Sequence, residues 1–387
     1  MIAMQTKALF VDAYRDLNAR KLFWVVLVLN ALVVGGFATI GVWKNHITIL
    51  GWAIPQEIPL AQFAYKWIFS YVIVGRWLTW GATILALIST ASIFPDFMAG
   101  GAIDLYLSKP IGRLRLFLTK YISGLLFVLL QVTVFTVSSF FVLGWRGHTW
   151  EPGLFLAIPI VVLFFSYLFC ICVLFGVLTR STLTSFFLTL VAWFMIFGIN
   201  QADSLLMQAD DLYRERSEQS QRRLVALDQR IADMEKRVGE PLAATQPGTQ
   251  PGTQPMGGSI LSWFVPAPSD AQQLARMKAE RGRAAESARA DQPPGWVKTA
   301  QPIVFGINTM VPKTQDTIGL LDRVLFTDTA MKLAATNTPQ RGPMHGWRDQ
   351  MQRLLHGRSI VWILGSSMGF EVVVLALAAW QFSRRDY

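Results

Sequence analysis

Long apolar runs separated by short polar connections dominate the chain. A lipid hydrocarbon core about 30 Å thick is crossed by about 20 apolar residues in a helix that rises 1.5 Å per residue. Six runs approach or exceed this length: residues 22–42, 77–94, 121–143, 154–178, 183–200 and 359–382. The second run has the least certain start, because residues 63–74 before it are also apolar. Since a strand edge finds no hydrogen-bond partner in lipid, all six are expected to be helices.

The polar stretch between the fifth and sixth runs, residues 204–358, differs from the rest and is predicted to be largely helical. Its first part has apolar residues at helical spacing: Leu224, Leu227, Ile231, Met234 and Val238. Fewer than three clean heptads are present, so a helical hairpin arm and a short coiled coil fit equally well. Residues 245–255, TQPGTQPGTQP, are typical of an extended spacer. A second polar helix is expected over residues 270–290.

A shorter apolar stripe follows closer to the last run. Ile318, Leu321, Val324 and Leu325 recur at helical spacing after Asp316, which is a candidate N-cap residue. Such a helix fits two positions. It can lie on the membrane surface or cap the helix bundle, or it can pack inside the insert.

Composition supports a membrane protein. Of 387 residues, 52% are hydrophobic and 16% charged, whereas soluble domains are about 25% charged. The fold class is therefore predicted to be all-α: a polytopic membrane protein with six transmembrane helices and a largely helical extracytoplasmic insert. The layout is an interfacial amphipathic helix or charged leader at 1–21, spans at 22–203, the insert at 204–358, and the last span with its tail at 359–387.

Orientation follows from the distribution of Lys and Arg in the connections, because these residues are enriched on the cytoplasmic side. With the N-terminus inside, eleven fall in cytoplasmic segments and three in short outer loops. We therefore expect a multi-pass protein of the cell (inner) membrane with both termini in the cytoplasm. This bias accounts for much of the net charge of +10, so membrane lipids are the expected counter-charge and nucleic acid is not an expected partner.

The sequence offers little chemistry of its own. It contains no phosphate-binding GxxxxGK[ST] loop, no HExxH and no GxSxG motif, so no catalytic residue and no cofactor is expected. Cys170 and Cys172 lie in the fourth span and are interpreted as packing residues. The four histidines lack ligand spacing, and no metal site is expected.

Glu371, midway along the last span, is the best single candidate for an intramembrane polar site. An ionised carboxylate there would cost about 2.5–3.5 kcal/mol or more unless it is paired, protonated or facing water. A structural hydrogen bond to a neighbouring helix is nearly as good an explanation. Gly365 and Gly369 in the same span have GxxxG spacing, which permits close helix packing.

The connection between the second and third runs is the most informative segment. It reads FPDFMAGGAIDLYLSKPIGRLRLFLTKY over residues 94–121. Gly100 and Gly101 permit a sharp turn, and a short apolar helix carrying Asp104 is expected before Lys109 and Pro110. From composition alone, a loop whose basic residues serve only topology is the favoured explanation.

The order of these residues resembles the corresponding loop of type 2 ABC export permeases, and the ending WQFSRRDY is similar to that family's ending. The resemblance implies a permease subunit that forms the translocation path and couples to a separate ATPase subunit, where ATP is hydrolysed. The implied ATPase-coupling residues are Asp96, Gly100, Asp104, Ser108, Lys109, Pro110, Arg113 and Arg115. Many members carry Glu where this chain has Asp96 after Pro95, a departure from the family pattern.

The resemblance also implies a dimer with a second copy or a sibling permease. The insert exceeds the usual outer region, which allows an additional extracytoplasmic partner. Two other classes remain. One is a stand-alone membrane scaffold or sensor whose insert binds a partner; the other, a membrane-embedded enzyme, has only Glu371 in its favour. A lipid-like or amphipathic cargo fits the apolar spans slightly better than an ion does.

Overall fold

The structure is a computed structural model that describes residues 21–44, 46–53, 55, 61–98, 112–239, 270–335 and 359–384. It is predominantly helical and divides into two compact units. The first contains residues 1–201 and 306–387, and the second contains residues 202–305. The predicted N-terminal interfacial helix and the 245–255 spacer lie outside the described residues.

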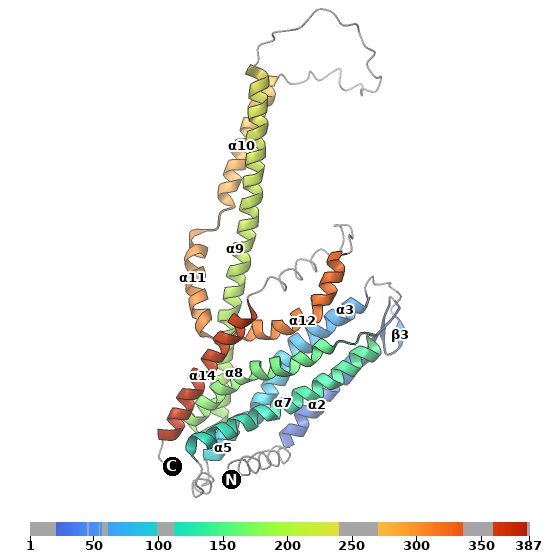
Figure 1. The fold of residues 1–387 in the computed structure, drawn as a ribbon, viewed down its shortest axis with the longest axis vertical. Coiled ribbons are helices and arrows are strands. Elements are labelled where there is room, and N and C mark those ends of the chain that lie inside the picture. The colour runs from blue at the N-terminus through green and yellow to red at the C-terminus, as the bar shows by residue number, and fades with distance from the viewer. Residues whose placement is uncertain are drawn as a thin grey trace, which may run out of the picture. The chain divides into compact units, whose positions relative to one another are not determined.

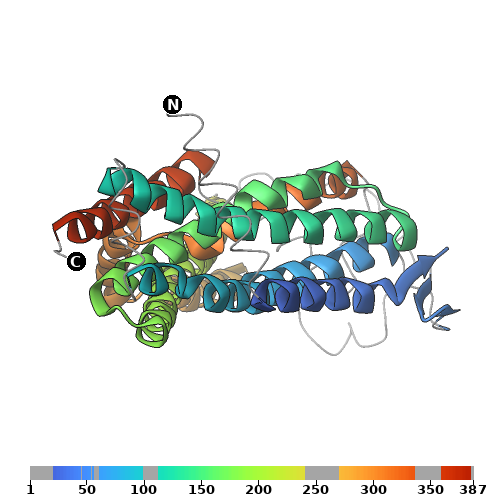
Figure 2. The same ribbon diagram turned by 90° about the horizontal axis from the view of Figure 1, so that it is seen from below.

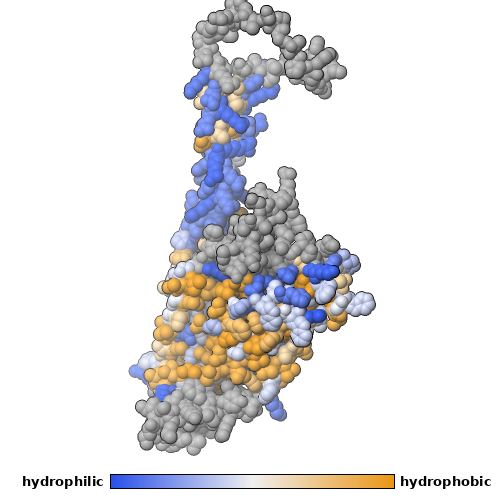
Figure 3. Space-filling model, turned by 45° about the vertical axis from the view of Figure 1, so that its right-hand side comes forward, coloured by the Kyte–Doolittle hydropathy of each residue, from blue (hydrophilic) through white to orange (hydrophobic). Residues whose placement is uncertain are grey.

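Six helices within the described residues are long and apolar enough to cross a membrane, which confirms the predicted all-α class. Each overlaps one predicted run: Lys21–Ala38, Ala64–Met98, Arg113–Arg146, Pro152–Thr179, Thr182–Lys236 and Ile360–Arg384. The second span begins at Ala64, before the predicted start at residue 77. The apolar residues 63–74 allowed this earlier start. Figure 3 shows a broad apolar surface over these helices.

Helix α8 (Ala157–Thr179) forms the centre of the bundle. Its most apolar window is 72% buried, against 17–39% for the other five spans. It packs against α7 (Arg113–Arg146) and α14 (Ile360–Arg384), and Figures 1 and 2 show α7 and α8 running lengthwise along each other. Because α8 is apolar on every side, it can bury all of its faces against other helices. Cys170 and Cys172 are buried here as free thiols.

The second span consists of several helical segments. It comprises α3 (Ala61–Ile68), the π-helix η1 (Phe69–Ala82), α4 (Thr83–Ala91) and α5 (Ile93–Met98). The hydroxyl groups of Thr79 and Thr83 donate to carbonyl oxygens five residues earlier, at 2.9 and 3.0 Å, which is the spacing of a π-helix. A turn at Ser92 separates α4 from α5.

A small antiparallel sheet follows the first span, α2 (Lys21–Ala38). Strands β1 (Ile40–Trp43), β2 (His46–Ile49) and β3 (Trp52–Ala53) pair in sequence order. The prediction of a helix up to residue 42 was therefore wrong at its end, because the chain turns into a strand after Ala38. The guanidinium of Arg146 donates to the carbonyl oxygen of Ala38 at 2.8 Å and holds the end of α7 against this turn.

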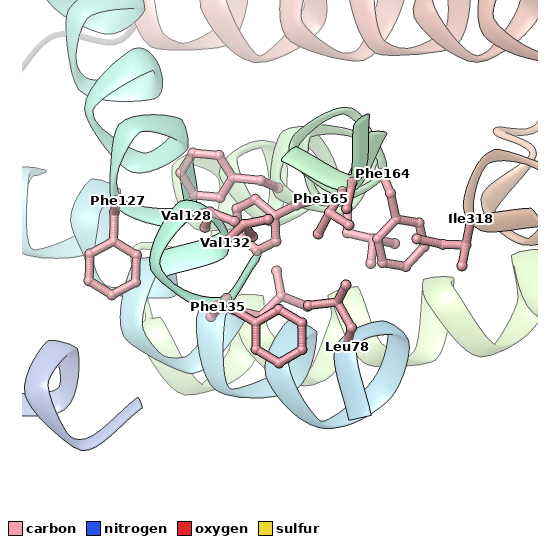
Figure 4. Packing of buried hydrophobic residues seen from close by; sticks show 14 of the residues in the cluster. Leu78, Phe127, Val128, Val132, Phe135, Phe164, Phe165 and Ile318 are labelled. Carbon is pink, nitrogen blue, oxygen red and sulfur yellow. The ribbon is translucent and has the colours of Figure 1, made fainter. Parts of the chain in front are cut away.

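The remaining bundle element is α12 (Thr314–Ala335), which packs on α8 and not inside the insert. Ile318, Leu321 and Leu325 belong to the hydrophobic core of the bundle, and Figure 4 shows Ile318 beside Phe164. Of the two predicted positions, the structure shows the one in which this helix caps the bundle. Asp316 is not the N-cap residue, because the helix already begins at Thr314.

We call the end of the bundle that carries Met98, Arg113 and Arg384 the loop end, and the opposite end, which carries the sheet, the sheet end. The N-terminus of α7, the end of α5 and the end of α14 meet at the loop end, where the Phe97 and Phe382 rings lie 6.2 Å apart.

The second unit contains an antiparallel helix pair. Helix α9 (Thr182–Gly239) continues from the fifth span, and residues of its distal half pair with α10 (Asp270–Ala290), whose bounds match the prediction. Ion pairs join Arg223 to Glu280 at 3.0 Å and Lys278 to Glu235 at 2.7 Å. The pairing order is that of a helical hairpin, with Leu227, Ile231 and Ala284 buried, and Figure 1 shows the two helices side by side. Helix α11 (Gly295–Met310) follows α10 and crosses into the first unit.

The hairpin is expected to weaken in acid. The hydrogen bond from Arg281 lowers the pKa of the exposed Asp228 carboxyl. A depressed folded-state pKa gives stability that is present above the unfolded-state pKa and is lost as the pH falls through the folded-state value. Replacing Asp228 by Asn should therefore speed amide hydrogen exchange in α10 at neutral pH by no more than a few-fold, as an exposed pair allows.

Glu218→Gln is the matched control for this experiment, because Glu218 pairs with Arg222 within α9 and not across the hairpin. Equal exchange in α10 for both variants would show that the pair between Asp228 and Arg281 does not hold the two helices together.

Candidate functional site

Glu371 of α14 faces two hydroxyl donors from the centre of the bundle. Its Oε1 accepts a hydrogen bond from Tyr121 Oη of α7 at 2.8 Å, and its Oε2 accepts one from Ser166 Oγ of α8 at 2.9 Å. Tyr121 stacks on Phe169, with ring centroids 5.2 Å apart, and this contact fixes the phenol. The site therefore joins the three helices α7, α8 and α14 through one carboxyl group.

The carboxyl of Glu371 is half-buried and has no Lys or Arg partner among the described residues. Arg76, directly before the sequence-predicted second span, instead donates to Tyr71 Oη at 2.8 Å. The Ser166 hydroxyl also has the carbonyl oxygen of Leu163 within 2.8 Å. The single hydroxyl hydrogen of Ser166 thus has two acceptors, the Glu371 carboxyl and the Leu163 carbonyl. The hydroxyl can therefore change its acceptor without a change in helix packing.

A buried cation, Lys313, contacts α14 about one helical turn before Glu371. The side chain of Lys313 is fully buried, and its Nζ donates to the carbonyl oxygens of Asn308 at 2.7 Å and Val311 at 3.1 Å. The ammonium also lies 4.4 Å from the centre of the Trp362 ring. The Lys313 backbone N–H donates to Ser367 Oγ at 2.9 Å. This residue holds the end of α11 and the start of α12 against α14.

Two further polar contacts fasten the sheet end. Lys66 of α3 and Glu151, just before η2 (Pro152–Leu156), form a largely buried ion pair at 2.6 Å. Ser70 of η1 donates a hydrogen bond to Asp322 of α12. Burial raises the pKa of the Asp322 carboxyl, and the hydrogen bond from Ser70 opposes the rise. The outer helices of the bundle are thus joined by polar groups as well as by apolar packing.

The implied coupling residues fall into two groups. Gly100, Asp104, Ser108, Lys109 and Pro110 lie outside the described residues. Asp96 is exposed in the first turn of α5, whereas Arg113 and Arg115 lie half-buried at the start of α7.

The residues that flank the connection between the second and third spans are held at the end of α14. Arg113 Nη1 donates to the carbonyl oxygen of Ser383 at 3.0 Å, and Lys120 Nζ lies 5.6 Å from the centre of the Phe97 ring. Both ends of the loop are thus brought to the same place, beside the last turns of the sixth span.

Sequence reasoning found Glu371 but missed its partners. Tyr121 and Ser166 lie 250 and 205 residues away in the chain, and a hydroxyl in an apolar run is unremarkable by itself. Lys313 was also missed, since a lysine in a polar insert gives no sign of burial. A comparison with family models, curated proteins and solved structures found no match.

We expect Tyr121 and Glu371 to be energetically coupled. A double-mutant cycle with Tyr121→Phe and Glu371→Gln should give a coupling energy of about 0.5–3 kcal/mol, the range for residues in direct contact. The measurement is unfolding of the full chain in lipid nanodiscs. Tyr71→Phe removes a phenol hydroxyl that bonds to Arg76 and should be additive with Glu371→Gln; coupling of equal size in both cycles would contradict the site described here.

Asp322 should make the bundle less stable as the pH rises. Its raised folded-state pKa means that its contribution to stability is present below the unfolded-state pKa and lost as the pH rises through the folded-state value. Asp322→Asn should therefore raise the melting temperature in neutral buffer more than in acidic buffer. The exposed Asp211→Asn serves as the control. A shift that is the same in both buffers would show that the Asp322 carboxyl does not titrate differently in the folded protein.

Proposed function

We propose that the protein is the membrane-spanning permease subunit of an ATP-driven exporter. The observation that carries this proposal is the order of residues 94–121, which resembles the ATPase-coupling loop of type 2 ABC export permeases. Six helices apolar enough to cross a membrane support it. So does the position of the loop between the second and third of them.

The geometry of the loop ends adds a mechanical reason. A loop that receives force from a soluble partner must be joined firmly to the spans, because a slack connection would absorb the movement. Here Phe97 contacts the Phe382 ring, and Arg113 bonds to the backbone of Ser383. Movement of the loop would therefore be passed to α5, α7 and α14 together.

In this proposal the loop end faces the cytoplasm, and closure of two ATPase subunits tilts the spans to expose a path on alternate sides. The permease would act as a pair with a second copy or a sibling chain. A membrane scaffold or sensor is retained as the alternative function, because the charged hairpin of the second unit offers an exposed surface to a partner.

The test is co-purification from the native host in detergent, comparing the wild-type protein with Asp104→Lys. We expect a soluble ATPase to be retained by the wild type and lost with the loop variant. Arg222→Glu, an exposed charge reversal in the hairpin of the second unit, is the control and should retain the ATPase.

Equal retention by Asp104→Lys would remove the loop from the contact. Failure of the wild type to retain any ATPase, even after crosslinking, would favour the scaffold function and direct attention to the hairpin.

A further inference from the structure

Helix α7 carries buried side-chain polar atoms that have no hydrogen-bond partner within the described residues. These are Gln131 Nε2, Thr136 Oγ1 and Ser139 Oγ, in side chains of residues that are 4%, 1% and 0% exposed. The hydroxyls of Thr149 and Tyr65 are unpaired in the same way at the sheet end of this helix. Tyr65 contacts Gly147, and the Thr149 backbone N–H donates to the carbonyl oxygen of Leu143. The unpaired groups are therefore distributed from the middle of α7 to the sheet end of this helix.

Helix geometry does not account for these unpaired hydroxyls. Thr119, Ser123 and Thr133 of the same helix each donate to the carbonyl oxygen four residues earlier, at 2.7–2.8 Å. Thr136 and Ser139 could do the same and do not. Because a buried polar group without a partner is costly, native proteins satisfy such groups with protein or with ordered water.

Gln131 opens into a pocket at mid-length of the bundle. Asn30 of α2 and Thr83 of α4 supply the other polar groups, and the walls are apolar. Figure 4 shows five of the wall residues, namely Leu78, Val128, Val132, Phe135 and Phe165. Asn30 Oδ1 accepts a hydrogen bond from Trp77 Nε1 at 2.9 Å, which leaves the Asn30 amino group available. Two carboxamides from different helices thus share a pocket whose lining contains no charged side chain.

The size and chemistry of the pocket select its ligand. The volume open to the centre of a water molecule is about 20 Å³, and about 10–15 Å³ is enough to hold one water. A bound water needs two to four polar partners, which Gln131 and Asn30 provide. An organic molecule the size of benzene needs a far larger cavity, on the order of 150 Å³.

We propose that this pocket is a binding site for water. In this proposal, ordered water bridges the carboxamides of Gln131 and Asn30, and further water molecules satisfy Thr136 and Ser139 toward the sheet end. The result is a hydrated seam inside an otherwise apolar bundle, from its middle to the end that carries the sheet. The seam gives α2 and α7 a polar contact that can rearrange without breaking direct hydrogen bonds between the helices. This proposal does not depend on the proposed permease function.

The test is radiolytic hydroxyl-radical footprinting of the full chain in lipid nanodiscs, because radicals formed from bound water modify adjacent side chains. Phe135 lines the pocket and is expected to be modified, although it is only 4% exposed. Phe127, two turns away on α7 and 1% exposed, does not line the pocket and is the matched control. Gln131→Leu should reduce the modification of Phe135 several-fold. Equal protection of both rings in the wild type, or unchanged modification of Phe135 in the variant, would overturn the proposal.

A second measurement separates a hydrated hydroxyl from a dry one. If Thr136 is bonded to water, Thr136→Val should leave the melting temperature unchanged or lower it. If the hydroxyl is dry and unpaired, the valine removes an uncompensated polar group, and the melting temperature should rise by about 2 °C or more. Such a rise would overturn the hydrated seam even if Gln131→Leu failed to fold.

Discussion

The burial of α8 is the constraint on which the bundle depends. Because α8 is the most buried of the spans, polar groups near it are satisfied by carbonyl oxygens of its own backbone or by side chains from distant parts of the chain. Ser166 illustrates this, since its hydroxyl lies against a carboxyl group from the last helix. The polar contacts of the bundle are therefore long-range, and they fix which helices are neighbours more precisely than apolar packing does.

Three ionisable side chains of the bundle, Lys66, Lys313 and Glu371, are held in different ways. Lys66 is paired with Glu151, so two charges offset each other. Lys313 has carbonyl oxygens and an aromatic ring around it, which replaces water by fixed dipoles and a ring face. Glu371 accepts two hydroxyl hydrogen bonds without a basic partner in the described structure. Of these three groups, Glu371 is the one held by hydroxyl donors from two neighbouring helices.

The spans and the polar helix α10 could be predicted from sequence because their signals are local. Apolar length and helical spacing identify them without knowledge of neighbours. The strand after Ala38 could not be predicted, since four residues that continue an apolar run show no period of their own. The length of α9 was missed for the opposite reason, because Gly198, a residue type that often ends a helix, lies inside α9 where the sequence changes from apolar to charged. The π-helical hydrogen-bond spacing in η1 gives no signal in the amino-acid composition.

The candidate site shows the same division between local and distant information. Glu371 is recognisable because a carboxylate in an apolar run is costly wherever it lies. Its partners, and the burial of Lys313, follow from which helices meet, and a single sequence does not contain this in readable form. The position of α12 is an intermediate case. Its apolar stripe was visible, but the bundle and the insert offered it equally good partners, and only the contact with α8 decides between them.

Helix α14 connects these contacts although it is the least buried span. Ser367 bonds to the backbone of Lys313 toward the sheet end, Glu371 bonds to α7 and α8 in the middle, and Ser383 bonds to Arg113 at the loop end. A straight helix of 25 residues is about 38 Å long and transmits axial displacement along its length. A displacement at the loop end would therefore reach the Glu371 hydrogen bonds directly.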